Sequence, residues 1–255
     1  MSALSKISTI YLVIFSVTTC SAPREYSLVI AAAANLQFAI EDIVNVFEKT
    51  SNIRCNLVVG SSGQLTTQLT EGAPYDVFLS ADLKYPNTLH DKDLTEGAPV
   101  IYAYGQLVLW SMVTKPPSSL RDHELDKFEH LAIANPLNAP YGAAAIESMK
   151  YSGVYEALKP KLVFGESISQ TNHFILSQSA EIGFTAKSVV LSPRMIDKGH
   201  WQDVDPASYQ PIAQGAVVMY GSKHLELAHE FLKFLFSDEA KAILKRYGYL
   251  VPENE

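Results

Sequence analysis

Four short turns carry the residues of this chain that could bind a charged ligand. Each turn stands between a hydrophobic, strand-like run and a segment with helical periodicity, and the turns are Ala34-Asn35, Ser61-Ser62, Pro140-Tyr141 and Ser167-Ile168. The first turn of a helix leaves backbone N–H groups unpaired and carries the positive end of the helix dipole. An oxyanion can be bound there without lysine or arginine, so the four turns together predict an anion site.

The residues at these turns offer neutral hydrogen-bond donors. The candidate ligand-binding residues are Ala34, Asn35, Ser61, Ser62, Tyr141 and Ile168. Asn35 could donate through its amide, Ser62 through its hydroxyl and Tyr141 through its phenol, whereas Ile168 could offer only a backbone N–H and an apolar wall. Each turn alone is equally typical of an ordinary helix cap. The repetition of the pattern favours an anion site.

A catalytic site or a metal-binding site has less support in the sequence. Ser62 is not part of a Gly-x-Ser-x-Gly sequence, and no recognisable signature supplies a base to activate it as a nucleophile. Asp76, Asp82 and Glu166 lie near the turns, but their spacing favours helix capping over a metal site. The histidines do not match a zinc motif on a helix. We therefore expect a binding protein without a catalytic residue, a bare metal ion or a cofactor.

The elements that position the turns alternate between strand and helix. A β-branched run at 26–30 is followed by an amphipathic segment, and similar strands at 55–59 and 77–79 precede further helical segments. The alternation resumes at 131–134, 161–164 and 181–184. This pattern predicts an α/β protein with mainly parallel sheets that are covered by helices.

Two lobes follow from the order of these elements. The long apolar run 100–110 is interpreted as one strand that crosses between lobes, and residues 215–244 as a return of the chain. We expect residues 21–103 and 212–255 to form lobe 1 and residues 104–211 to form lobe 2. In α/β folds ligands bind at the carboxyl ends of strands, so the cleft between the lobes should collect all four turns.

Composition and the amino terminus restrict the partners and the location. The formal net charge of −7 and the lack of a basic stripe argue against nucleic acid and anionic membranes as partners. Residues 1–20 resemble an export signal with Lys6 ahead of a short apolar run, although a buried N-terminal strand is an alternative. The sequence before Cys20 partly matches a lipoprotein box, so lipidation of Cys20 stays open. Cys55 is most simply a buried strand residue.

Several longer motifs resemble the periplasmic molybdate-binding proteins of ABC transporters. They are Ala32 to Leu36, Gly60-Ser61-Ser62, the string from Gly72 to Asp82, and Lys245 to Tyr249. The resemblance implies a two-lobed periplasmic-binding-protein fold and capture of molybdate, or tungstate, for a membrane permease. It also implies that Asn35, Ser62, Tyr141 and the backbone of Ile168 hold the anion, joined by the backbone N–H groups of Ala34 to Asn35 and of Ser61 to Ser62. A periplasmic monomer is expected.

Two departures from the family pattern and several alternatives remain. Many members have serine where Asn35 stands, although an amide can also donate to an oxyanion. A tyrosine of some members is replaced by Ala186, and Tyr141 could supply the missing hydroxyl from elsewhere. Alternative ligands are sulfate, another oxyanion or a small carboxylate. An enzyme on the same fold, or a sensor or adhesin component, are the other functional classes.

Overall fold

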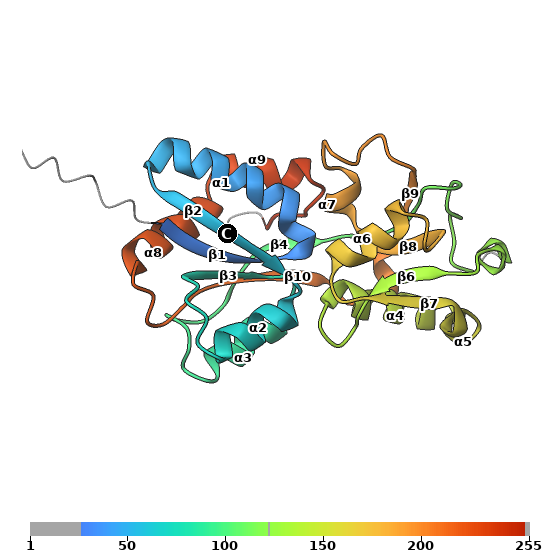
Figure 1. The fold of residues 1–255 in the computed structure, drawn as a ribbon, viewed down its shortest axis with the longest axis horizontal. Helices are drawn as coiled ribbons and strands as arrows, with labels where there is room; N and C mark the ends of the chain where they lie inside the picture. The colour runs from blue at the N-terminus through green and yellow to red at the C-terminus, as the bar shows by residue number, and fades with distance from the viewer. Residues whose placement is uncertain (1–26, 122, 253–255) are drawn as a thin grey trace, which may run out of the picture.

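The computed structural model describes residues 27–121 and 123–252, which form two lobes, each built on a five-stranded sheet (Figure 1). The predicted signal at residues 1–20, with Lys6 and Cys20, lies outside the described residues. Among the helices of the described part, none has the length and apolar character needed to cross a membrane.

The sheet of lobe 1 has the strand order β2-β1-β3-β10-β4. Its strands are β1 (Ser27–Ala33), β2 (Arg54–Gly60), β3 (Val77–Ser80), β4 (Val100–Gly105) and β10 (Ile212–Val218). Strand β1 pairs in parallel with β2 and β3, whereas β10 is antiparallel to β3 and β4. Parallel β1, β2 and β3 therefore bring their carboxyl ends to one edge of the lobe.

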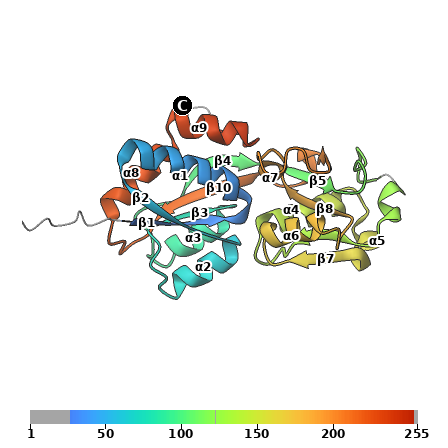
Figure 2. The same cartoon turned by 45° about the horizontal axis from the view of Figure 1, so that its top comes forward.

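Helices cover both faces of this sheet (Figure 2). One face carries α1 (Gln37–Ser51), α8 (Leu225–Leu235) and α9 (Asp238–Arg246), and the other carries α2 (Ser62–Thr70) and α3 (Lys84–His90). Side chains alternate between the faces, because Leu28 and Ile30 join the first core and Ala31 joins the second. A short 3-10 helix, η1 (Ala34–Leu36), connects β1 to α1.

Lobe 2 repeats this plan with the strand order β7-β6-β8-β5-β9. Its strands are β5 (Leu107–Ser111), β6 (Leu131–Ala134), β7 (Leu162–Gly165), β8 (Ile182–Ala186) and β9 (His200–Asp203). Its helices are α4 (Pro140–Tyr151), α5 (Tyr155–Leu158), α6 (Ile168–Leu176) and α7 (Lys187–Val190), with 3-10 turns η2 (His123–Lys127), η3 (Lys159–Lys161) and η4 (Pro206–Ser208). The predicted two-lobed α/β fold is confirmed, and each sheet is mixed, with β5 antiparallel to β8 and β9.

The chain passes between the lobes at Gln106. The run 100–110, predicted as one strand, is two strands: β4 ends at Gly105 in the first sheet, and β5 begins at Leu107 in the second. Gln106 interrupts the run because its carbonyl accepts the N–H of Lys187 at 2.9 Å and its amide donates to the carbonyl of Gly248 at 2.6 Å. The crossing is thus anchored to lobe 2 and to the C-terminal segment.

Cys55 lies in the edge strand β2, where it is half-buried and makes no disulfide. The sequence predicts a buried strand residue, but β2 is at the edge of its sheet, so part of Cys55 is exposed to solvent. Burial, together with the nearby Glu48, raises the pKa of the thiol to about 12. The thiol therefore stays protonated at neutral pH and is a poor nucleophile or metal ligand.

Candidate oxyanion-binding site

The four turns meet at one cavity between the lobes. The space between its lining atoms is about 190 Å³, part of it open to solvent, and the lining consists of Ala33, Ala34, Asn35, Ser61, Ser62, Ala81, Ala139, Pro140, Tyr141 and Ile168. All six candidate residues from the sequence belong to this lining, and every side chain in it is neutral. Any charge that binds here must be stabilised by dipoles and hydrogen bonds rather than by an opposite charge.

Helix starts provide the donors of this cavity. Ser62 is the first residue of α2, Ile168 is the first residue of α6, and Tyr141 follows Pro140 at the start of α4. Backbone N–H groups at these positions have no carbonyl acceptor in the preceding turn of their own helix. Because the positive ends of three helix dipoles converge from two lobes, the cavity favours an anion.

The Ser62 hydroxyl is oriented as a donor. Its oxygen accepts the N–H of Ala81 at 3.0 Å, and its side chain is 1% exposed. A hydroxyl has one hydrogen and two acceptor lone pairs. With the oxygen already accepting from Ala81, the hydrogen remains for an acceptor within the cavity.

Ser61 caps the start of α2. Its N–H donates to the side chain of Gln64 at 3.4 Å, and its hydroxyl accepts the Gln64 N–H at 3.3 Å. This reciprocal pair is a capping box, for which the spacing Ser-x-x-Gln is the sequence signal. The backbone N–H of Ser61 therefore donates to Gln64 at the start of α2.

The side chain of Asn35 also forms hydrogen bonds within the protein. Its amide donates to Gln214 Oε1 at 2.7 Å and to Tyr249 Oη at 2.9 Å, so both amide hydrogens have acceptors within the protein. The Gln214 amide in turn donates to the carbonyls of Ala81 and Ile212, which fixes its oxygen toward Asn35. The Asn35 side chain is thus engaged within the protein and holds the backbone of Asn35 in place beside the cavity.

Sequence reasoning missed Gln214 and Tyr249 as supports of the site. Gln214 is fully buried in β10, and Tyr249 is 3% exposed near the C-terminus. Gln214 could have been noticed from the sequence, because it is a polar residue within the mostly apolar strand β10. Tyr249 stands in the motif Lys245 to Tyr249, which resembled the family without indicating a contact to Asn35.

Tyr141 brings a phenol from lobe 2 to the cavity. Its side chain is 2% exposed, and among the described residues its hydroxyl has no hydrogen-bond partner. Burial, with the nearby Tyr249 hydroxyl, raises the pKa of Tyr141 well above its usual value. The group therefore stays a neutral phenol at physiological pH, and its hydroxyl lies near the Asn35 amide and the Tyr249 hydroxyl.

A family model described as bacterial extracellular solute-binding protein matches residues 28–250. The chain belongs to this family. Among curated relatives, the molybdate-binding protein ModA of Rhodobacter capsulatus is 39% identical over 227 residues, which cover 88% of each chain. ModA of Azotobacter vinelandii is 37% identical over 225 residues, covering 86% of this chain and 88% of the relative.

The fold agrees with these relatives. The solved periplasmic molybdate-binding protein of Azotobacter vinelandii superimposes with a TM-score of 0.83 at 30% identity, covering 89% of this chain and all of that one. The resemblance inferred from the motifs is confirmed, as is the two-lobed fold.

The lobes of this solute-binding protein are in direct contact on one rim of the cavity. The N–H of Gly63 in α2 donates to the carbonyl of Asn138 at 2.9 Å. The hydroxyl of Tyr85 in α3 donates to the carbonyl of Leu137 at 2.8 Å. Both donors belong to lobe 1 and both acceptors to lobe 2, so these bonds join the lobes at this rim.

Further contacts join the lobes behind the cavity and along α1. The Ser188 hydroxyl of lobe 2 donates to the Asn35 carbonyl at 2.6 Å, and Ser169 donates to the side chain of Gln37 at 3.0 Å. Arg194 forms an ion pair with Glu41 at 2.8 Å, which is exposed and therefore weak. Ala186 is fully buried at the end of β8 and is not part of the cavity lining.

The acidic residues near the turns serve the fold. Asp76 accepts the N–H of Val29 at 2.7 Å, and Asp82 accepts the N–H of Tyr85 at 3.2 Å near the start of α3. The carboxylate of Glu166 accepts from the amide of Asn138 at 3.4 Å. Each carboxylate has its own donor within the protein, which agrees with the structural role expected for them.

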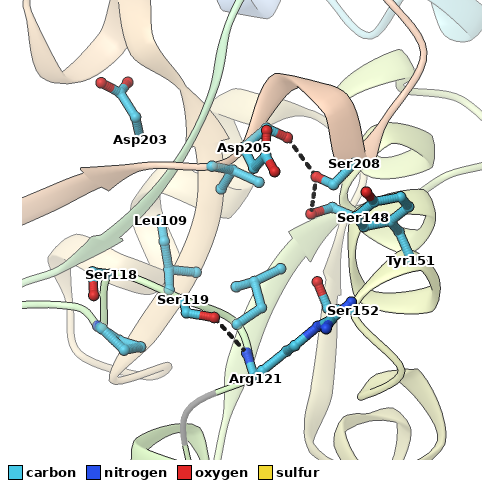
Figure 3. Close-up of a pocket in the computed structure, with 13 residues that line it drawn as sticks. Leu109, Ser118, Ser119, Arg121, Ser148, Tyr151, Ser152, Asp203, Asp205 and Ser208 are labelled. Carbon is cyan, nitrogen blue, oxygen red and sulfur yellow. Dashed lines mark hydrogen bonds between the residues drawn. The ribbon is translucent and has the colours of Figure 1, made fainter.

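Lobe 2 contains a second pocket that is less suited to an anion (Figure 3). Its lining includes Asp203 and Asp205 but only one cationic side chain, Arg121. The hydroxyls of Ser148 and Ser208 lie 2.7 Å apart and are bonded to each other. Two carboxylates and mutually satisfied hydroxyls give this pocket no preference for negative charge.

One group of potential metal ligands occurs in the described part of the chain, although the sequence showed none. Glu129, His130 and Glu181 place ligand atoms within 4.8 Å of one another, and two of the three residues are exposed. The Glu181 carboxylate accepts the backbone N–H of His130 at 2.9 Å. The group precedes β6 and β8, at the end of the sheet opposite the cavity.

Proposed function

We propose that this solute-binding protein captures molybdate, and tungstate through the same contacts, for delivery to an ABC-type permease. The proposal rests above all on the convergence of helix starts, with the Ser62 hydroxyl and Tyr141, on one cavity whose lining is neutral. The relatives named molybdate-binding proteins support the choice of ligand. The cavity contains donors for an oxyanion and lacks an activated nucleophile, which favours capture over catalysis.

The proposed donor set is smaller and more rigid than the sequence implied. It consists of backbone N–H groups at Ala34, Asn35, Ser62 and Ile168, with the hydroxyls of Ser62 and Tyr141. Hydrogen bonds to a charged group contribute about 1.5–3 kcal/mol each, so six give about 9–18 kcal/mol before costs. Association and ordering cost about 4–15 kcal/mol, which leaves room for tight binding when the donors are already in place.

Selectivity arises from the fixed positions of these donors. The capping box holds the start of α2, and the N–H of Ala81 orients Ser62. Sulfate has the same charge and tetrahedral shape as molybdate, but its bonds are shorter. Donors that cannot move inward would not all reach the smaller anion, so sulfate should bind more weakly.

Closure of the lobes would signal that the anion is bound. An anion that contacts α2 of lobe 1 and α6 of lobe 2 stabilises the closed form by its differential affinity for that form. A permease that recognises the closed form then receives loaded protein preferentially. We also propose that residues 1–20 act as a signal for export to the periplasm.

Calorimetric titration with molybdate, tungstate and sulfate tests the proposed function. We expect one-to-one binding of the first two anions and at least about 100-fold weaker binding of sulfate, a difference of about 2.7 kcal/mol. Tighter binding of sulfate, or of a small carboxylate in a parallel titration, would contradict the choice of ligand. Turnover of any bound compound would instead support the alternative of an enzyme.

Tyr85→Phe should speed the release of molybdate by about 3- to 10-fold, because it removes one neutral hydrogen bond of about 0.5–1.5 kcal/mol that joins the closed lobes. Stopped-flow dissociation measures the effect. Tyr75→Phe is the matched control, since the Tyr75 hydroxyl donates to Gln68 within the same lobe at 2.9 Å. Equal release rates for the two variants would show that the bond between Tyr85 and Leu137 does not hold the closed form.

A further inference from the structure

Gly105 lies where lobe 1 meets the phenol of lobe 2. It is the last residue of β4, immediately before the crossing at Gln106, and it is buried. A Cβ atom at this position would lie 2.0 Å from Tyr141 Oη and 2.9 Å from Tyr141 Cζ. The side chain of Tyr141 therefore occupies the space that any other residue at 105 would fill.

The backbone of Gly105 does not itself require glycine. Gly105 is absent from the glycines whose φ is positive, and it pairs with Ile212 within the sheet. Apart from Tyr141, the nearest atom to a Cβ would be Gln214 Nε2 at 3.1 Å, which small adjustments could accommodate. The steric demand for glycine comes from the opposite lobe.

Tyr141 has little freedom to avoid an added side chain. It is buried in the core of lobe 2, and Pro140 at the first position of α4 fixes the backbone where the helix begins. Its stiff ring turns about only two torsion angles, and burial restricts both. An added Cβ would push the start of α4 away from lobe 1, and with it Tyr141, which lines the cavity.

We propose that Gly105 is a positioning residue for anion binding, because the lack of a side chain there lets Tyr141 seat across the junction when the lobes close. This inference rests on the proposed function, since it takes the anion in the cavity as the ligand. In an open form α4 moves away with lobe 2, so a side chain at 105 would be tolerated. Gly105 would thus affect closure and affinity without being needed for folding.

Gly105→Ala should weaken molybdate binding by at least about 30-fold while the melting temperature without ligand changes little. Titration calorimetry gives the affinity, and thermal unfolding with and without molybdate gives the shift caused by the ligand. Gly60→Ala is the matched control, because it also changes the last residue of a lobe 1 strand, but its Cβ would meet only side chains of its own lobe, Leu65 at 3.3 Å and Gln64 Oε1 at 3.9 Å. We expect Gly60→Ala to change affinity by less than about 3-fold.

A double-mutant cycle separates this role from general damage to β4. If Gly105 acts through Tyr141, Gly105→Ala should cost less than about 3-fold in a Tyr141→Ala background, where the phenol is gone. Equal losses in both backgrounds, or wild-type affinity in Gly105→Ala, would overturn the inference while leaving the proposed function intact. Wild-type protein that fails to bind molybdate would overturn both. Should Gly105→Ala fail to fold, the inference requires Gly105→Ala/Tyr141→Ala to fold.

Discussion

Replacing Asn35 by aspartate is expected to weaken molybdate binding by at least about a thousandfold, or about 4 kcal/mol. The carboxylate has nearly the shape of the amide but cannot donate to Gln214 Oε1 or Tyr249 Oη, which now accept from Asn35 at 2.7 and 2.9 Å. It also brings a negative charge to the lining of a cavity proposed to hold a dianion. Two unit charges about 4 Å apart repel by about 4 kcal/mol at an effective dielectric constant near 20. Titration calorimetry at neutral pH measures the loss.

The neutral variant Asn35→Ser is the control for this prediction. Serine also removes both amide hydrogen bonds but adds no charge. We expect it to bind at least about tenfold more tightly than Asn35→Asp. Equal affinities would mean that the charge at 35 is not felt by the ligand, which would place the anion away from η1.

Ser62→Ala should weaken molybdate binding by about 10- to 100-fold, because the hydroxyl donates a bond of about 1.5–3 kcal/mol to a charged ligand. The variant also leaves the N–H of Ala81 without the Ser62 oxygen that accepts it at 3.0 Å, so a modest loss of stability is expected too. Calorimetry measures the affinity, and urea unfolding of the ligand-free protein measures the stability.

Ser222→Ala is the matched control for Ser62→Ala. The Ser222 hydroxyl donates to the carboxylate of Asp76 at 2.6 Å, in the same lobe but beside the start of β3 and thus away from the cavity. Its removal should lower stability without changing affinity. If both variants bound molybdate equally tightly, Ser62 would not be a ligand.

The positions of the four turns could be predicted from sequence because they depend on local order. A strand that ends at a small or hydroxyl residue before a helix places that residue at the carboxyl edge of the sheet, and this reasoning brought Ser62, Tyr141 and Ile168 to one cavity. The direction of hydrogen bonding was not predictable in the same way. Asn35 reaches partners 179 and 214 residues away in the chain, and no local pattern specifies such contacts.

Two further details, the cap at Ser61 and the strand break at Gln106, depend on polar side chains. Gln64 stands three residues after Ser61, which is the capping-box spacing, yet Ser61 was assigned to the ligand. The apolar run 100–110 concealed a break because Gln106 has hydrogen-bond partners only in the folded chain. In both cases the sequence pattern predicted the helix or the strand, and the hydrogen-bond partners of a glutamine determined how the element begins or ends.

Diffraction from crystals grown with molybdate, recorded at the molybdenum absorption edge, tests the central claim most directly. The account predicts one anomalous peak in the inter-lobe cavity, within hydrogen-bond reach of the Ser62 hydroxyl and of the N–H of Ile168, and no lysine or arginine in contact with it. A peak only in the lobe 2 pocket beside Arg121, or no peak in the cavity at saturating molybdate, would contradict it.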